Sequence, residues 1–165
     1  NTTMESVSIP EGVTEIGFAA FAQCYNLKSV KLPKSLVKIE QSAFSGCVAL
    51  QKIEYPRNAR LELCNYAFGK TGLIELNLPE NVVLKDECVF ADCGKLTKVR
   101  VEIKGEIRSL TFAGCTSLKT VFLGKGVSAI EDYAFDNCSS LSEINYEGDN
   151  KEIQKKVDQL LEKQN

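Results

Sequence analysis

Seven cysteines are the residues whose chemistry stands out first in this sequence of 165 residues. Thiolates can bind soft metal ions, form disulfides or act as nucleophiles. No two of these cysteines form a Cys-x-x-Cys pair, and the spacing of Cys88 and Cys93 is a poor one for a metal site. The chain also has no histidine, which is the commonest general base and a frequent metal ligand. The pattern therefore predicts no metal site.

Two other short motifs suggest chemistry. Gly69-Lys70-Thr71 resembles the end of a phosphate-binding loop, but the first glycine of that motif falls on Cys64. Asn1 and Asn137 each begin an Asn-x-Ser/Thr glycosylation acceptor, which matters only in a eukaryotic source. No nucleophile has an evident activating base, and the carboxylates are spread along polar positions. We therefore expect a protein without enzymatic activity, catalytic residues or a cofactor.

Composition excludes further classes of function. The formal net charge is −2, whereas nucleic-acid binders usually carry a strong basic excess. No apolar run approaches the roughly 18 residues that a membrane span needs. Because the chain begins Asn-Thr-Thr and enters a strand pattern by Val7, we expect any leader peptide to lie outside this sequence.

An internal repeat of about 23 residues organises the chain, and its clearest copy runs over residues 27–47. That copy reads Leu-x-x-Val-x-Leu-Pro, then Leu-x-x-Ile, then Ala-Phe-x-x-Cys. The four prolines follow one another at steps of 23 residues: Pro10, Pro33, Pro56 and Pro79. The phenylalanines recur at steps of 22 to 24: Phe21, Phe44, Phe68, Phe90, Phe112 and Phe135.

Each copy begins with a segment in which apolar and polar residues alternate, as in a half-buried strand. The strand segments centre on these apolar pairs: Val7/Ile9, Val30/Leu32, Ile53/Tyr55, Leu76/Leu78, Val99/Val101, Val121/Leu123 and Ile144/Tyr146. Because one strand recurs per copy in the same direction, about seven strands should stack into a parallel sheet.

The rest of each copy forms a return limb, with a second short extended piece followed by a tight helical turn. Leu36 and Ile39 show the extended piece, and Lys85 is expected at the position of Ile39. The turn should carry a column of stacked, reduced and buried thiols: Cys24, Cys47, Cys93, Cys115 and Cys138, with Thr71 in the third copy. Cys64 and Cys88 lie off this column, on neighbouring return limbs, and are the one pair to check for a disulfide.

The pattern changes at Asp149, which we expect to cap a helix over residues 149–165 with Glu152 completing a capping box. One stripe of this helix is apolar: Ile153, Val157, Leu160 and Leu161. A helix with a polar outer face suits the open end of a solenoid, although docking of a partner remains an alternative. The sequence thus predicts a repeat domain over residues 1–148 and a capping helix over residues 149–165.

Together these residues resemble the BspA-like, or treponemal, class of leucine-rich repeats, and the likeness extends over residues 4–146. The resemblance implies an α/β fold: a right-handed leucine-rich repeat solenoid with a concave parallel sheet, short strands and helical turns on the return limb, and a C-terminal capping helix. It also implies a bacterial cell-surface or secreted protein that binds a host, matrix or other surface protein.

Outward side chains on the concave sheet are the candidates for such binding. Phe122 is an aromatic in a column whose neighbouring copies have Arg100 and Asn145, and both aromatics and arginines are favoured as interface anchors. The predicted protein-binding residues are Phe122, Arg100, Lys98, Asn77, Glu75 and Thr120. The alternative is that Phe122 is a lone exposed hydrophobe, as is common on protein surfaces.

Two functions fit the repeat. The first is a recognition module, expected to be a monomer, that binds another protein and neither nucleic acid nor a bilayer. The second is a structural spacer within a longer surface protein. A cluster of apolar and charged residues on one part of the sheet favours binding, whereas a uniformly polar sheet favours the spacer.

Overall fold

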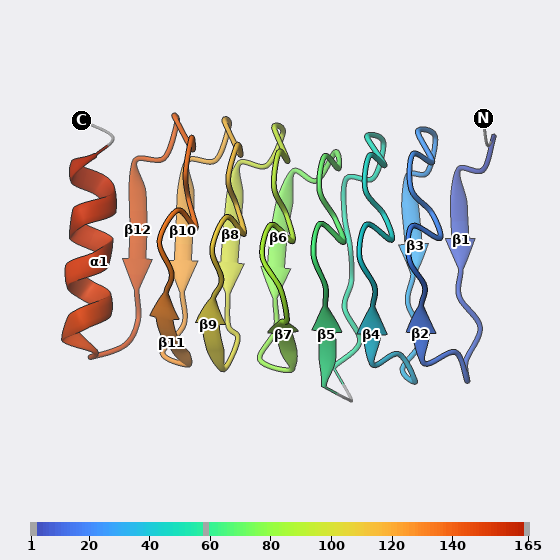
Figure 1. The fold of residues 1–165 in the computed structure, drawn as a ribbon, viewed down its shortest axis with the longest axis horizontal. Helices are drawn as coiled ribbons and strands as arrows, with labels where there is room; N and C mark the ends of the chain where they lie inside the picture. Colours follow the sequence, from blue (N-terminus) through green and yellow to red (C-terminus); the bar gives the residue numbers. More distant parts are fainter. Residues whose placement is uncertain (1–2, 58–59, 164–165) are drawn as a thin grey trace.

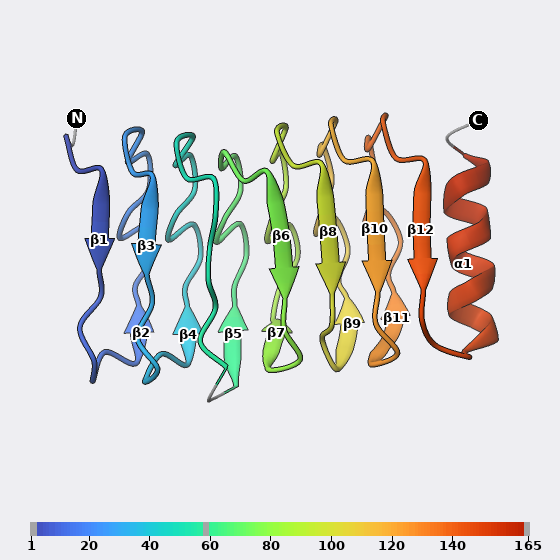
Figure 2. The same ribbon diagram turned by 180° about the vertical axis from the view of Figure 1, so that it is seen from behind.

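A computed structural model describes residues 3–57 and 60–163. Successive repeats stack side by side along the long axis of the molecule, from the N-terminus at one end to helix α1 at the other (Figures 1 and 2). Each turn of this solenoid places one extended segment on one face and another on the opposite face. We call the first the concave face and the second the return face.

The strands of the concave face are parallel, and their register follows the repeat, as in the pairing of Thr120 with Lys98 and with Glu143. Their bounds are β1 Ser6–Ser8, β3 Ser29–Lys31, β6 Glu75–Leu78, β8 Lys98–Val101, β10 Thr120–Leu123 and β12 Glu143–Tyr146. They form two sheets, ordered β1-β3 and β12-β10-β8-β6. Between these sheets the third copy contributes only a single bridge, between Lys31 and Glu54. The described residues therefore give six strands and one bridge instead of about seven strands.

Tyr55 lies on the inward side of this irregular third segment. Its ring fills the inward position that holds Leu32 and Leu78 in the flanking copies, and it packs edge-on against Phe68 with 6.1 Å between ring centroids. The Tyr55 hydroxyl is buried without a hydrogen-bond partner among the described residues.

The return face carries a second series of parallel strands in two sheets, ordered β2-β4-β5-β7 and β11-β9. Their bounds are β2 Glu15–Ile16, β4 Lys38–Ile39, β5 Leu61–Leu63, β7 Val82–Leu84, β9 Gly105–Ile107 and β11 Val127–Ile130. The pairing of Ile39 with Leu63, and of Leu63 with Leu84, corrects one prediction. Leu84, and not Lys85, occupies the position of Ile39, because Leu84 follows Pro79 by five residues whereas Ile39 follows Pro33 by six. Lys85 instead faces Glu62, with 3.5 Å between Nζ and Oε2.

A single apolar core runs the length of the solenoid, and a stack of phenylalanine rings lies at its centre. Neighbouring rings are nearly parallel, with centroids 5.2–5.7 Å apart. Five of the six rings are buried, which confirms the predicted column, but Phe21 at the N-terminal end is only partly buried.

The cysteine column lies beside the phenylalanines, and all seven cysteines are free, including Cys64 and Cys88. Four of the thiols donate to the carbonyl of the phenylalanine one repeat earlier, as Cys138 does to Phe112 at 3.1 Å. Thr71 takes the expected place in copy three, where its hydroxyl donates to the Phe68 carbonyl. Burial raises the pKa of both Cys47 and Cys138 to about 12, so these thiols stay protonated and unreactive at neutral pH.

The turns that connect the two faces contain left-handed residues where a regular helical turn was predicted. Each turn has two residues with positive φ, two positions before and two positions after the phenylalanine. The non-glycine members have φ between 52° and 62° and include Leu110 and Tyr133. Where another repeat follows, N–H groups of the turn donate to it, as in Ala19 to Gln41, Phe21 to Ala43 and Gln23 to Ser45 at 2.7–3.0 Å. These inter-repeat bonds hold the turns in a conformation that such side chains rarely adopt.

Helix α1, Lys151–Glu162, packs against β11 and β12 at the C-terminal end (Figure 1). Ile153 and Val157 are buried, and Leu160 and Leu161 pack partly buried against the same core, as the apolar stripe predicted. The N-cap is Asn150 and not Asp149, because the extended backbone of Asn150 brings its side-chain oxygen to the N–H groups of Glu152 and Ile153. In the described part of the chain no helix has the length and apolar character needed to cross a membrane.

Of the two glycosylation acceptors, Asn1 lies outside the described residues. Asn137 has φ 55° in the last return turn, directly before the buried Cys138.

Candidate functional site

The six predicted protein-binding residues lie on three adjacent strands of the concave face. Cross-strand pairing places Glu75, Lys98 and Thr120 in one row. It places Asn77, Arg100 and Phe122 in the next row, with Asn145 continuing this row on β12. We call these six residues the Phe122 patch. The structure brings all six together, because the 23-residue period holds the register of β6, β8 and β10.

Phe122 is only partly exposed, since two cations from β8 lie over its ring. Lys98 Nζ is 5.2 Å and Arg100 Cζ is 5.6 Å from the ring centroid. Both distances are within the range of a cation–π contact. The ring is therefore partly ordered before any partner arrives, which lowers the entropy cost of using it in an interface.

Arg100 is fixed by two carboxylates. Its Nε is 2.6 Å from Glu102 Oε1, and its Nη2 is 2.9 Å from Glu147 Oε1. The hydrogen bonds that Arg100 donates to Glu147 and Glu102 raise the pKa of Arg100 above its ordinary value, so its positive charge is constant. The guanidinium is thus held in one orientation beside Phe122.

The sequence analysis did not identify the residues that hold Arg100, which are Glu102, Glu147 and the intervening Gly124. Arg100 and Glu147 belong to β8 and to the end of β12, so the ion pair crosses the intervening repeat at Gly124. A Cβ at Gly124 would lie 2.5 Å from Glu102 Oε2, so a side chain at this position would displace the carboxylate. The sequence does contain a sign of these contacts. At the repeat position of the four prolines, the later copies have Glu102, Gly124 and Glu147.

Five of the six patch residues line a shallow hollow of about 220 Å³, together with the buried side chain of Leu76. Thr120 is the sixth member and lies outside the hollow, with its hydroxyl 3.3 Å from Glu143 Oε2. The hollow thus combines an aromatic wall, an apolar floor, an amide and charges of both signs.

Lys98 differs from most cations on this face. Lys52 is paired with Glu54 at 2.7 Å and Arg100 is paired twice, whereas Lys98 forms no ion pair with any described carboxylate. Its ammonium group therefore keeps the capacity to bind an acidic group of a partner.

The N-terminal part of the concave face is different in character. Its outward residues on β1 and β3 are three serines and Lys31. Here the described strands present no aromatic side chain and no clamp like that on Arg100. Charged residues such as Lys31, Lys52 and Glu54 also occur in the first three copies, but the aromatic ring and the doubly paired arginine are found together only at β8 and β10 among the described strands of this face.

In residues 3–57 and 60–163 no three potential metal-ligating side chains come together. The cysteines form a buried column within the core, and Gly69-Lys70-Thr71 belongs to the return turn of copy three, with Thr71 buried. None of these motifs therefore contributes to the Phe122 patch.

The stacked parallel strands, the return limbs and the columns of Phe and Cys define a leucine-rich repeat solenoid. Six copies of the BspA type leucine rich repeat region match the chain, over residues 1–104 and 60–158. The chain belongs to this family.

Solved structures of similar fold come from several bacteria. The leucine-rich repeat protein of T. pallidum superposes with a TM-score of 0.75 at 27% sequence identity, over 94% of this chain and 70% of that protein. The pneumococcal vaccine antigen PcpA gives a TM-score of 0.75 at 22% identity, over 94% of this chain and 39% of that chain. A leucine rich cell surface protein from Faecalibacterium prausnitzii A2-165 gives a TM-score of 0.47 at 25% sequence identity, over 92% of this chain and 62% of that chain. No functionally curated protein matches the sequence.

Proposed function

We propose that this chain is a non-enzymatic recognition module that binds another protein through the Phe122 patch. The observation that carries the proposal is the fixed pair of Phe122 and Arg100 beside a hollow with an unpaired Lys98. An aromatic ring next to an oriented guanidinium supplies apolar burial and a directional charge contact at one place. The uneven distribution of such residues along the concave face favours this function over that of a uniform spacer.

The location and the partner belong to the same proposal. The resemblance to BspA-like proteins supports a cell-surface or extracellular site, with a host, matrix or other surface protein as the ligand. Lys98 and Arg100 favour a partner that presents an acidic side chain next to an apolar one, because complementary charge aligns two surfaces as they meet.

The test is binding of the purified chain to a panel of host and matrix proteins, measured by surface plasmon resonance. For any protein that binds, Phe122→Ala should weaken the affinity by about 2 kcal/mol or more, which is the usual threshold for a hot spot. Because Phe122 is half-buried, the melting temperature of the variant is measured beside the affinity.

Two controls separate the patch from the rest of the face. Ser8→Ala lies in the same outward column on β1 and should leave binding unchanged. Lys98→Gln should weaken binding, whereas Lys31→Gln, which removes another exposed lysine from the same face, should not. If a partner is found and the Phe122 and Lys98 variants bind it normally, the site lies elsewhere. If no protein binds, the spacer function is the better account.

A further inference from the structure

The outer edge of the return turns carries a column of apolar side chains in copies three to six. In each of these copies the residue two positions before the phenylalanine has a left-handed backbone and a side chain that is at least partly exposed. These residues are Tyr66, Cys88, Leu110 and Tyr133. The turns lie side by side (Figure 1), and bonds such as that from the Phe90 N–H to the Thr111 carbonyl, at 2.9 Å, join them. Copies one and two have the small residues Ala19 and Ser42 at this position, so the column lies toward the C-terminal end.

The first and the last member of the column are tyrosines. A Cβ at Gly69 would lie 2.2 Å from Tyr66 Cδ1, so the Tyr66 ring lies against its turn only because Gly69 has no side chain. The Tyr66 hydroxyl donates a hydrogen bond to Asp92 Oδ2 of the next copy, and this bond holds the ring. Tyr133 is 67% exposed. Tyrosine is enriched in protein interfaces, and a ring that is ordered in advance loses less entropy on binding.

The charges beside the column are mainly acidic. The four turns, residues 64–71, 86–93, 108–115 and 131–138, contain six acidic and two basic residues. The acidic residues are Asp86, Glu87, Asp92, Glu131, Asp132 and Asp136, and the basic residues are Lys70 and Arg108. Lys85, directly before the turn of copy four, is paired with Glu62 on β5.

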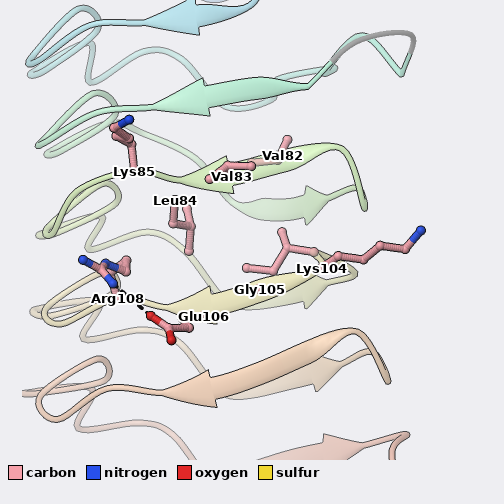
Figure 3. Close-up of a pocket in the computed structure, with 9 residues that line it drawn as sticks. Val82, Val83, Leu84, Lys85, Lys104, Gly105, Glu106 and Arg108 are labelled. Atoms are coloured by element: carbon pink, nitrogen blue, oxygen red, sulfur yellow. Dashed lines mark hydrogen bonds and ion pairs between the residues drawn. The ribbon is translucent and has the colours of Figure 1, made fainter.

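Most of this negative charge is not matched by nearby cations. Arg108 is shared between Glu106 on β9, at 2.9 Å (Figure 3), and Glu131, at 3.0 Å. Lys156 of α1 is paired with Asp132. The other four acids of the turns form no ion pair with any cation in the described part of the chain: Asp86, Glu87, Asp92 and Asp136. The edge therefore combines an apolar column with an excess of negative charge, which favours a cationic partner.

The spacing of the column matches that of side chains along an α-helix. The phenylalanine rings of the same four turns follow one another at 5.3–5.7 Å. A helix rises by about 1.5 Å per residue, so residues i, i+4, i+7 and i+11 form a row with steps of about 4.5–6 Å. A helix that lies along the edge can thus place one apolar side chain beside each turn. Side chains on one face of a strand recur at about 6.8 Å, so an extended peptide would lose this register within three turns.

We propose that the edge formed by Tyr66, Cys88, Leu110 and Tyr133 is a docking site for an amphipathic helix of a partner protein, whose apolar stripe is flanked by lysine or arginine. The apolar stripe lies on the column, and the basic residues face the acids of the turns. Helices are recognised in this manner through anchors at i, i+4 and i+7. This edge is separate from the Phe122 patch and selects the opposite charge, so the proposal does not depend on the function proposed for that patch.

Docking is tested by NMR titration of the intact chain with a helical peptide of leucine, lysine and alanine, in which leucines recur at i, i+4, i+7 and i+11 and lysines flank them. The peptide should cause saturable shifts of the Cys88, Asp92 and Leu110 amides, with a dissociation constant on the order of 0.1 mM. Circular dichroism of the mixture should show that the peptide gains helix.

Two further peptides separate shape from charge. A peptide of the same composition with leucine at every second position should bind at least about tenfold more weakly, because its apolar side chains have the period of a strand. A peptide with glutamate in place of lysine should not bind, because its charge has the same sign as that of the edge.

Variants locate the site on the chain. Tyr133→Ser, and Asp86→Asn combined with Glu87→Gln, should each weaken binding of the helical peptide at least about fivefold. These side chains are exposed, so the melting temperature should stay the same. Glu11→Gln combined with Glu15→Gln is the matched control, because it removes two exposed acids from the first copy.

Three results would overturn the proposal. The first is the absence of saturable shifts at the turns of copies four and five. The second is equal affinity for the helical peptide and for the alternating peptide, since charge alone would then explain the binding. The third is the appearance of the same shifts when the chain alone is concentrated, because the occupant of the edge would then be a second copy.

Discussion

The two ends of the solenoid differ in how far the apolar core of the terminal repeat is covered. At the C-terminal end α1 covers the last repeat, so Phe135, Leu141 and Ile144 are at most 8% exposed. At the N-terminal end nothing among the described residues covers the first repeat, where Phe21 and Val7 are only partly buried and Phe18 is 71% exposed. A repeat cannot bury its own apolar surface alone, so each end depends on what is stacked against it. Stability should therefore be distributed unequally along the molecule.

Removal of α1 should have the largest effect. Deletion of residues 151–165 loses the buried Ile153 and Val157, each worth about 1.5–3 kcal/mol, and uncovers the last repeat. Deletion of residues 1–10 should cost less than half as much, because the apolar side chains lost there are only partly buried. Urea unfolding and sedimentation velocity measure both truncations. Equal losses at the two ends would contradict the capping role of α1.

The next effect concerns the phenylalanine stack. Phe44 is fully buried between two rings, so Phe44→Ala should cost about 3–5 kcal/mol of unfolding free energy. Phe21 stacks on one neighbour only, and Phe21→Ala should cost at most about half of that amount. Chemical denaturation of the two variants provides the comparison. A loss below about 1 kcal/mol for Phe44→Ala would mean that the column does not form the core.

Thiol labelling should show the difference between the ends without any mutation. Cys138 lies under α1 with no exposed surface, and burial raises its pKa to about 12. Cys24 belongs to the open end, where local opening is easier. A thiol reagent at pH 8 should therefore modify Cys24 before Cys138, as identified by mass spectrometry of peptides. Denatured protein should label at both positions, and faster labelling of Cys138 in the native protein would refute the argument.

The smallest effect should be the acid sensitivity of the contact between α1 and the last return turn. A hydrogen bond from Lys156 lowers the pKa of Asp132 below its ordinary value. The stabilisation is therefore complete above the unfolded pKa of about 3.9 and is lost as the pH falls through the lower folded value. Asp132→Asn and Lys156→Gln should both flatten the decline of melting temperature below about pH 4. An unchanged pH profile in both variants would mean that the pair does not hold α1.

The features of the fold that follow from the length of the repeat could be predicted from the sequence. A repeat of 22 to 24 residues fixes which residues share a column, so the strand register, the phenylalanine stack and the grouping of Phe122 with Arg100 and Lys98 could all be predicted. Parallel stacking leaves no freedom in such positions once the repeat is recognised. The binding role of those residues remains a prediction.

Other features depend on local backbone geometry that spacing does not report. The third copy fits the apolar pattern of a strand, but among the described residues it forms only the bridge between Lys31 and Glu54. The cap at Asn150 depends on one extended residue, and either Asp149 or Asn150 satisfies the preference for the N-cap. The left-handed conformations of Ala19 and Ser42, whose N–H groups donate to carbonyls of the following repeat, have no signature in residue type.

The hydrogen bonds between successive return turns all have the same direction along the solenoid. Their N–H groups point toward the C-terminal end and their carbonyls toward the N-terminal end, repeat after repeat. Each peptide carries a dipole of about 3.5 D, and aligned dipoles add, as they do in a helix. Within the described residues the carbonyls of Phe18, Ala20 and Ala22 accept no hydrogen bond at the open end. The column of return turns is thus polar along the solenoid, and its negative pole lies at the N-terminal end of the described residues.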